Sequence, residues 1–292
     1  MVPMPSNRES LIGAVVLACA FVFLFSAVAT KAQQCSISPK TTDLGGTLRL
    51  TCPAEVSSAK WNDRTIRLFR QADGKSFGLM PVSVKDSAGP ASIEFLSKEG
   101  TAFATGKFLV RATRFPSENV RLSPDIEALR STPEEIQLLT TFRNEVTDDR
   151  FWQDPLAPPV DGCVTSPFGV KRMHNGKPTG EFHGGVDQRT PAGEEIRAIA
   201  DGKIVFAKKF NVLGNAVGID HGQGLGSMYL HMSKLAVADG APVKKGDVLG
   251  YAGSTGRSTG PHLHWVLYAN GVNINPAQWV NLSACPRPPK KK

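Results

Sequence analysis

Three short glycine-flanked segments of the chain carry the residue types that hold and use a catalytic metal ion. His183 and Asp187 stand four positions apart in EFHGGVD, and His262 and His264 stand two apart in GPHLHW. Between these segments, the run YLHM contributes His231. Zinc in a catalytic site takes three protein ligands, typically His, Asp, Glu or Cys, and leaves a fourth position to water. These segments therefore predict one zinc site.

The five residues divide into ligands and proton carriers. His183, Asp187 and His264 would supply two imidazoles and one carboxylate, which leaves one zinc ion per chain with a residual positive charge that activates water and polarises a carbonyl group. Because alternate residues of a strand point to the same face, His262 projects beside His264 and can face the water. Peptide hydrolysis also needs a proton shuttle, for which His231 and His262 are the candidates.

Two glycines separate His183 from Asp187, and a non-metal interpretation of the five polar residues is also possible. Gly184 and Gly185 are predicted to let the chain turn, so that His183 and Asp187 converge on one ion. The alternative is five solvated or structural polar side chains, because His-x-x-x-Asp or His-x-His alone is common. Their occurrence together favours the metal site.

The pattern resembles the M23 family of lysostaphin/LytM-like zinc metallopeptidases. The resemblance spans Cys163 to Pro276 and adds the motifs SPFG, PAG, ADG, YLH, STG and GPHLH to the His-x-x-x-Asp pair. Met232 stands where Leu is usual and Trp265 where Phe is usual, both apolar replacements. The resemblance implies that His183, Asp187 and His264 bind the metal and that His231 and His262 form the catalytic pair. It also implies that the substrate is the peptide part of peptidoglycan.

Other functions remain possible at this point. The chain could be a non-catalytic or latent envelope protein that binds peptidoglycan or activates a wall hydrolase, although non-catalytic relatives usually lack one of the five residues. The net charge of +8 and pI near 9.3 suit anionic surroundings such as wall polymers. Nucleic acid would suit the same charge, but no motif supports it, so no nucleic-acid partner is expected.

The N-terminus is predicted to be an export signal covering residues 1–32. Arg8 precedes an apolar run from Leu11 to Ala29, which ends in small residues. An uncleaved membrane anchor is the alternative, because the run is long enough to span a bilayer. A lipoprotein signal at Cys19 is disfavoured, since the apolar run continues past it. The expected location is the periplasm or cell envelope, or outside the cell after secretion.

Four cysteines remain after the signal: Cys35, Cys52, Cys163 and Cys285. An even number of cysteines in an exported chain predicts disulfides, and three pairings are possible. We favour Cys35 with Cys52 and Cys163 with Cys285, because each pair then stays within one domain. Zinc ligation is the alternative, but no Cys-x-x-Cys spacing is present.

The fold is predicted to be mostly β in two domains. Residues 33–120 alternate as in TLRLTC and predict a small β-sandwich, which resembles the immunoglobulin-like modules found before some M23 domains. Residues 163–285 are expected to be antiparallel β, and the resemblance implies an M23 peptidase domain there. Residues 121–162 are expected to be a helical connector and a proline-rich linker, and 286–292 a basic tail. Loops at 171–181 and 210–215 are expected to wall the groove.

The connector is predicted to be helical from Ser123 to Val146. The run TPEE is a capping box with proline at the first helical position, and Ile136, Leu139, Phe142 and Val146 recur at helical spacing. We expect this helix to pack across the two domains; a regulatory arm beside the site is the alternative. After it, Phe151 and Trp152 are expected to anchor an extended linker, residues 154–162.

Overall fold

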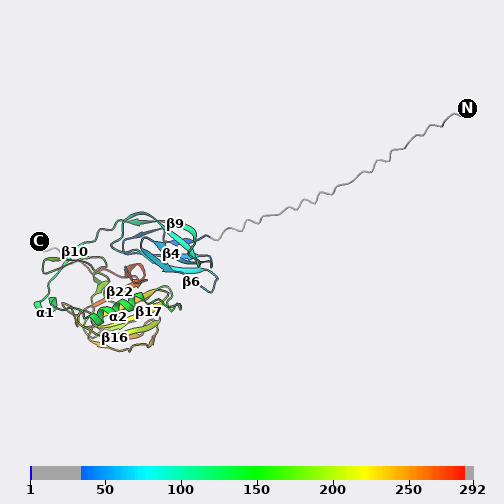
Figure 1. Cartoon of the computed structure of the whole chain (residues 1–292). Helices are drawn as coiled ribbons and strands as arrows, with labels where there is room; N and C mark the ends of the chain where they lie inside the picture. The colour runs from blue at the N-terminus through cyan, green and yellow to red at the C-terminus, as the bar shows by residue number, and fades with distance from the viewer. Residues whose placement is uncertain (2–33, 287–292) are drawn as a thin grey trace. The chain divides into compact units, whose positions relative to one another are not determined.

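The computed structural model describes Met1 and residues 34–286, and its strands confirm a mostly β protein (Figure 1). The predicted signal at 1–32, with Arg8 and Cys19, and the tail from Arg287 onward lie outside the described residues. Among the helices that are described, none has the length and apolar character needed to cross a bilayer. From residue 34 on, the described chain clusters in one compact unit, so the predicted domain boundaries stay predictions.

Two sheets enclose the core of the N-terminal part. The first orders β1 (Ser36–Ser38), β3 (Thr47–Cys52), β7 (Ser76–Pro81) and β6 (Phe69–Arg70). The second orders β2 (Thr41–Asp43), β9 (Ala102–Arg111), β8 (Gly89–Ser97), β4 (Val56–Trp61) and β5 (Arg64–Arg67). Leu48, Leu50 and Cys52 are buried on one side of β3, as the alternation predicts, and pack with Phe95 and Phe108 of the second sheet.

Two disulfides close the pairs expected from the sequence. Cys35 bonds to Cys52 and Cys163 bonds to Cys285. The first bond lies within the N-terminal sheets and the second joins residues far apart in the sequence. The preferred pairing is confirmed, and these cysteines are therefore not metal ligands.

The connector is two helices rather than the single helix predicted from Ser123 to Val146. They are α1 (Pro124–Glu127) and α2 (Pro133–Asn144). The break falls at Thr132, whose extended backbone precedes a proline, and a residue before proline disfavours the helical conformation. The capping box is confirmed, because Thr132 Oγ1 accepts from the Glu135 amide at 3.2 Å and Glu135 Oε2 accepts from the Thr132 amide at 3.0 Å.

Helix α2 packs on one face of the large C-terminal sheet (Figure 1). Phe142 is buried edge-on against Phe206 and Tyr268, and Leu139 joins the same cluster. The predicted apolar face is only partly correct, because Ile136 is 55% exposed and Val146 lies beyond the helix end.

The C-terminal part is built around one antiparallel sheet. Its order is β11 (Val164–Ser166), β14 (Val186–Gln188), β22 (Leu263–Ala269), β18 (Leu225–Met232), β17 (Gly214–Gly222), β16 (Gly202–Phe210) and β20 (Pro242–Val243), with β23 (Val272–Ile274) beside β22. A smaller sheet orders β15 (Glu195–Arg197), β21 (Val248–Tyr251) and β19 (Lys234–Leu235). The register pairs His264 with Asp187 on one side and with Leu230 on the other. Three segments far apart in the sequence thus meet at one end of the sheet.

Residues 171–181, predicted to be a loop, instead form a hairpin. Strand β12 (Lys171–His174) pairs with β13 (Lys177–Phe182), and β10 (Ser117–Val120) adds a parallel strand. Although the prediction put residues 117–120 in the β-sandwich, β10 pairs with this hairpin and not with the sandwich sheets, so the connector is taken below to include it. The turn signal Asn175-Gly176 has both residues at positive φ, as a tight hairpin turn requires. The sequence interpretation missed it because the flanking residues are polar.

The segment 154–162, which was predicted to be an extended linker, packs against the core of the C-terminal part. Leu156 and Val160 are buried in the C-terminal core, and the Ala157 amide donates to the Ile199 carbonyl. Trp152 is fully buried there and acts as the predicted anchor, whereas Phe151 is 39% exposed and does not.

His221 is buried inside this sheet, as expected of a structural histidine. Its Nδ1 donates to the Asp201 carbonyl at 2.7 Å, so Nε2 accepts from the Ser227 hydroxyl at 2.7 Å. Ser227 Oγ in turn lies 3.0 Å from the Tyr229 hydroxyl. Burial lowers the pKa of His221 to about 4, so the ring is neutral at neutral pH.

This buried ring predicts an acid-dependent loss of stability. Between pH 6.5 and 4 the unfolded chain binds a proton at this histidine that the folded chain excludes, so the free energy of unfolding falls as the pH drops. The pKa difference corresponds to about 3 kcal/mol. Denaturant titrations across this range should show a shallower pH dependence for His221→Asn than for the unaltered chain. Parallel profiles would rule out this contribution of His221.

Candidate metal centre

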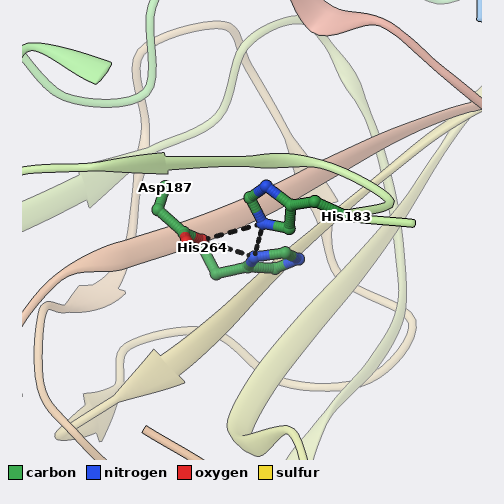
Figure 2. A group of neighbouring side chains, drawn as sticks. All are labelled: His183, Asp187 and His264. Carbon is green, nitrogen blue, oxygen red and sulfur yellow. Dashed lines mark hydrogen bonds and ion pairs between the residues drawn. The ribbon is translucent and has the colours of Figure 1, made fainter. Parts of the chain in front are cut away.

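Three side chains converge on one point at the end of the sheet (Figure 2). His183 Nε2 lies 3.1 Å from Asp187 Oδ1 and 2.9 Å from His264 Nδ1, and His264 Nδ1 lies 2.6 Å from the same Asp187 oxygen. Asp187 and His264 come from paired positions of β14 and β22, and His183 comes from the turn before β14. The structure thus brings the three predicted ligands together.

The chemistry of these donors fits a cation. His183 Nδ1 donates to the Pro167 carbonyl at 2.9 Å, which leaves a lone pair on Nε2 pointing at the other two residues. Tetrahedral ligands about 2.1 Å from zinc stand roughly 3.4 Å apart, so the three atoms would have to separate by only some tenths of an ångström. Two imidazole nitrogens and one carboxylate oxygen form a ligand set of the catalytic zinc type.

The carboxylate of Asp187 is held in its charged form. Burial alone would raise its pKa, but His183 Nε2 and His264 Nδ1, when either carries a proton, donate a hydrogen bond to Oδ1 and lower the pKa well below the usual value. Its second oxygen, Oδ2, accepts from the Arg172 guanidinium at 2.9 Å. Arg172 therefore occupies Oδ2 and leaves Oδ1 for the shared point.

His231 lies beside this group in a constrained geometry. Its φ of 62° is left-handed, which is uncommon for a residue other than glycine. Its Nδ1 donates to the Thr255 carbonyl at 2.8 Å, which directs Nε2 away from that carbonyl as a free lone pair. Burial, followed by the nearby histidines, lowers its pKa to about 3, so the ring is neutral.

His262 completes the set of five. Its Nδ1 donates to the Gly260 carbonyl at 2.8 Å, and its Nε2 lies 3.8 Å from Asp187 Oδ1. The rings of His231 and His262 are 5.1 Å apart between centroids. His262 and His264 therefore project to the same side, and every residue singled out in the sequence reaches the same centre.

The two glycines between His183 and Asp187 serve a different purpose from the turn freedom predicted for them. Neither adopts a positive φ. A β-carbon on Gly184 would stand 2.3 Å from the Asn273 side chain, and one on Gly185 would stand 2.1 Å from the Trp265 carbonyl oxygen. The glycines are needed because neighbouring atoms approach closely, which a single sequence does not reveal.

Sequence reasoning missed a series of hydrogen-bonded side chains that supports the predicted ligand Asp187. Glu118 Oε2 accepts from the Ser166 hydroxyl at 2.5 Å and from Arg172 at 2.7 Å, and Arg172 also holds Asp187. Ser166 stands in the SPFG motif, which was the one available signal. Glu118 has none, because it belongs to the connector, 48 positions before Ser166.

A groove of about 890 Å³ opens over the centre. The hairpin contributes Arg172, His174 and Phe182, and Val212 and Leu213 of the predicted 210–215 wall also line it. His174 is half-buried there, and burial, followed by the charge of Arg257, lowers its pKa. The connector residues from Glu118 to Leu122 form another edge.

Comparison with known proteins adds to this geometry. Residues 181–276 match peptidase family M23. The chain is 45% identical over 121 residues to the DD-carboxypeptidase/endopeptidase Mpg of Neisseria meningitidis serogroup B, and 36% identical over 136 residues to the peptidoglycan DD-endopeptidase ShyA of Vibrio cholerae. Residues 181–276 are therefore an M23 peptidase region. The matched region is shorter than the expected span from Cys163 to Pro276.

The likeness covers different shares of these proteins. The two alignments cover 41% and 46% of this chain but only 28% and 31% of the relatives, so the chain spans under a third of their length. A crystal structure described as a peptidase M23 from Pseudomonas aeruginosa is 27% identical, covers 81% of this chain and 93% of that one, and has a TM-score of 0.61. The similarity of fold to this M23 protein thus reaches beyond residues 181–276.

The contact between Arg172 and Asp187 predicts a change in metal affinity. In Arg172→Ala, Asp187 loses the partner that fixes Oδ2, and loss of such a supporting contact typically weakens metal binding about 10–100-fold. Competition with a chromogenic chelator measures this directly. Lys177→Ala, an exposed lysine on the same hairpin, is the control and should bind zinc as the unaltered chain does. Equal affinity of the arginine variant and the control would contradict the assignment.

Proposed function

We propose that the chain is a zinc-dependent endopeptidase that hydrolyses peptide bonds in the stem peptides or cross-links of bacterial peptidoglycan. The carrying observation is the convergence of three lone-pair donors with two further histidines in one groove. The M23 match at residues 181–276 and the printed activities of the Neisseria and Vibrio relatives support the same reaction and substrate class.

In this proposal His183, Asp187 and His264 hold one zinc ion, and His231 and His262 are the catalytic pair. Zinc bound there would act as a Lewis acid on the scissile carbonyl and lower the pKa of a water molecule. Asp187 supplies the only negative charge among the five residues, so the ion keeps a net positive charge. The groove then positions the peptide with its carbonyl group toward that charge.

The proton steps fall to the two remaining histidines. Hydrogen bonds from Nδ1 to backbone carbonyls leave Nε2 of both His231 and His262 as proton acceptors. His262 Nε2, nearest to Asp187, would accept the proton of the attacking water. The pKa of His231 is about 3, so its Nε2 carries no proton at neutral pH and would accept a hydrogen bond from the same water; the proton taken up by His262 would then pass to the leaving amine.

We further propose that the protein acts in the cell envelope. The substrate class of the relatives and the two disulfides support an exported protein. The charge of +8 suits a substrate that carries many carboxylates. Attachment to a membrane would require the N-terminal signal to remain uncleaved.

A latent form of the same enzyme has one observation in its favour. Glu118 to Leu122 form an edge of the groove, and Asn175 Nδ2 donates to the Leu122 carbonyl at 3.1 Å. The connector could therefore restrict entry until β10 leaves the hairpin. A non-catalytic binding role has no such support, since all five residues are present.

Substitutions should separate binding of zinc from turnover. His264→Ala is expected to lose both zinc and cleavage of purified peptidoglycan, because two ligands do not retain the ion. His231→Ala and His262→Ala should keep zinc at one per chain and lose at least about 100-fold in rate, the usual contribution of proton transfer. Metal analysis and mass spectrometry of the released fragments give the two measurements.

The controls decide between the active and latent forms. A chelator should stop cleavage and zinc should restore it. Zinc at one per chain without cleavage would favour the latent form, in which case Asn175→Gly, which removes the bond to the Leu122 carbonyl, should restore cleavage. Full cleavage by His264→Ala would refute the proposed site.

A further inference from the structure

A second cleft lies next to the groove, where the end of β9, the start of β10 and the hairpin meet. Its volume is about 590 Å³. Leu44 and Val84 form its apolar side, and Phe115 and Phe182 form its aromatic side. Two cations, Arg114 and Lys171, stand in its lining, and no carboxylate does.

The two cations have no counter-charge in the described part of the chain. No ion pair or side-chain hydrogen bond there involves Arg114 or Lys171, although Arg111 close by is paired with Asp43. Both side chains are exposed to solvent. Their charges are therefore available to an anion in the cleft.

The walls of the cleft are held by close packing. The rings of Phe115 and Phe182 meet edge to face at 5.7 Å. Phe115 lies so close to Gly169 that a β-carbon there would stand 2.2 Å from the ring. The Lys171 amide donates to the Pro116 carbonyl at 2.8 Å, which fixes the backbone of one cation beside the segment that carries the other. The backbone positions from which the two cationic side chains extend are thus set by the fold.

Phe182 connects this cleft to the groove. It lines both cavities and immediately precedes His183. The carbonyl of His183 accepts from the Gly169 amide at 2.8 Å, the glycine on which Phe115 packs. A peptide whose scissile carbonyl lies at the metal centre would reach the cleft within a few residues, since extended chain advances about 3.3 Å per residue.

We propose that this cleft is a subsite that binds a free carboxylate of the stem peptide, some residues from the scissile bond. The proposal rests on the proposed function and specifies the substrate further. Arg114 would bind the carboxylate through two N–H groups of its planar guanidinium, and Lys171 would bind it through its ammonium charge. Phe115 and Phe182 would pack against the aliphatic part of the same peptide residue. Substrates with this carboxylate free are preferred over those in which it is amidated.

The test compares charge on the protein with charge on the substrate. The full chain, Arg114→Ala, Lys171→Ala and the double variant are assayed on cross-linked peptidoglycan peptide dimers with free or amidated side carboxylates. For the free dimer, the double variant should raise KM about tenfold while kcat changes less than twofold, because the contact is made away from the reacting bond. For the amidated dimer, KM should be nearly the same in every chain.

Two controls make the outcome decisive. Lys177→Ala removes an exposed lysine from the same hairpin that lines neither cavity, and its KM should not change. Equilibrium binding of the uncut free dimer to His264→Ala, with and without the two substitutions, should show the same tenfold difference without any turnover.

The proposal and the proposed function fail in different ways. If the unaltered chain cuts the dimers but the double variant has an unchanged KM, or loses equally on free and amidated dimers, the subsite is refuted. If no chain cuts, the proposed function fails, and the binding measurement alone decides whether the cleft takes a carboxylate. Unchanged binding there would refute the subsite as well.

Discussion

The convergence of three lone pairs on one point is the constraint on which the rest of this structure depends. His183 Nε2, Asp187 Oδ1 and His264 Nδ1 lie within 3.1 Å of one another. Such an arrangement is unfavourable unless a cation or shared protons occupy it, so the fold must hold it in place. The rigid element is the antiparallel register that pairs Asp187 with His264 across β14 and β22. A slip of one residue would turn one ligand to the opposite face of the sheet.

Backbone carbonyls orient the imidazoles that this register brings close. His183, His231 and His262 each donate through Nδ1 to a carbonyl, those of Pro167, Thr255 and Gly260. Each bond fixes one tautomer and points Nε2 toward the centre. Those carbonyls lie in loops rich in glycine and proline. What these loops must supply is a particular backbone conformation rather than particular side chains. This is why the short motifs around the histidines are as recognisable as the histidines themselves.

The sequence was sufficient for the parts of the site that depend on residue type and local spacing. The five polar residues, the alternation in β3 and the Thr132 capping box carry local signals, and the cysteine pairing followed from keeping each pair within one domain. The hairpin at 171–182 carries a turn signal at Asn175-Gly176, although its flanking residues are polar. The contact of Glu118 with Arg172 and the close approaches at Gly184 and Gly185 carry none. They arise from pairing between distant segments, and no short pattern encodes which segment will lie alongside another. The break before α2 could have been anticipated from Pro133, which excludes a continuous helix through Thr132.

The missed contacts also explain why the connector matters for the chemistry. Arg172 and a metal ion would both draw on the charge of Asp187, so an arginine bound to Asp187 alone would reduce the ability of that carboxylate to hold the ion. Glu118 shares the guanidinium, with 2.7 Å to one nitrogen while Asp187 takes another at 2.9 Å. The positive charge of Arg172 is thereby divided between two carboxylates, and more of the negative charge of Asp187 stays on Oδ1. Since Glu118 comes from β10, outside the matched region 181–276, the set of charges around the candidate metal centre is complete only with β10 in place.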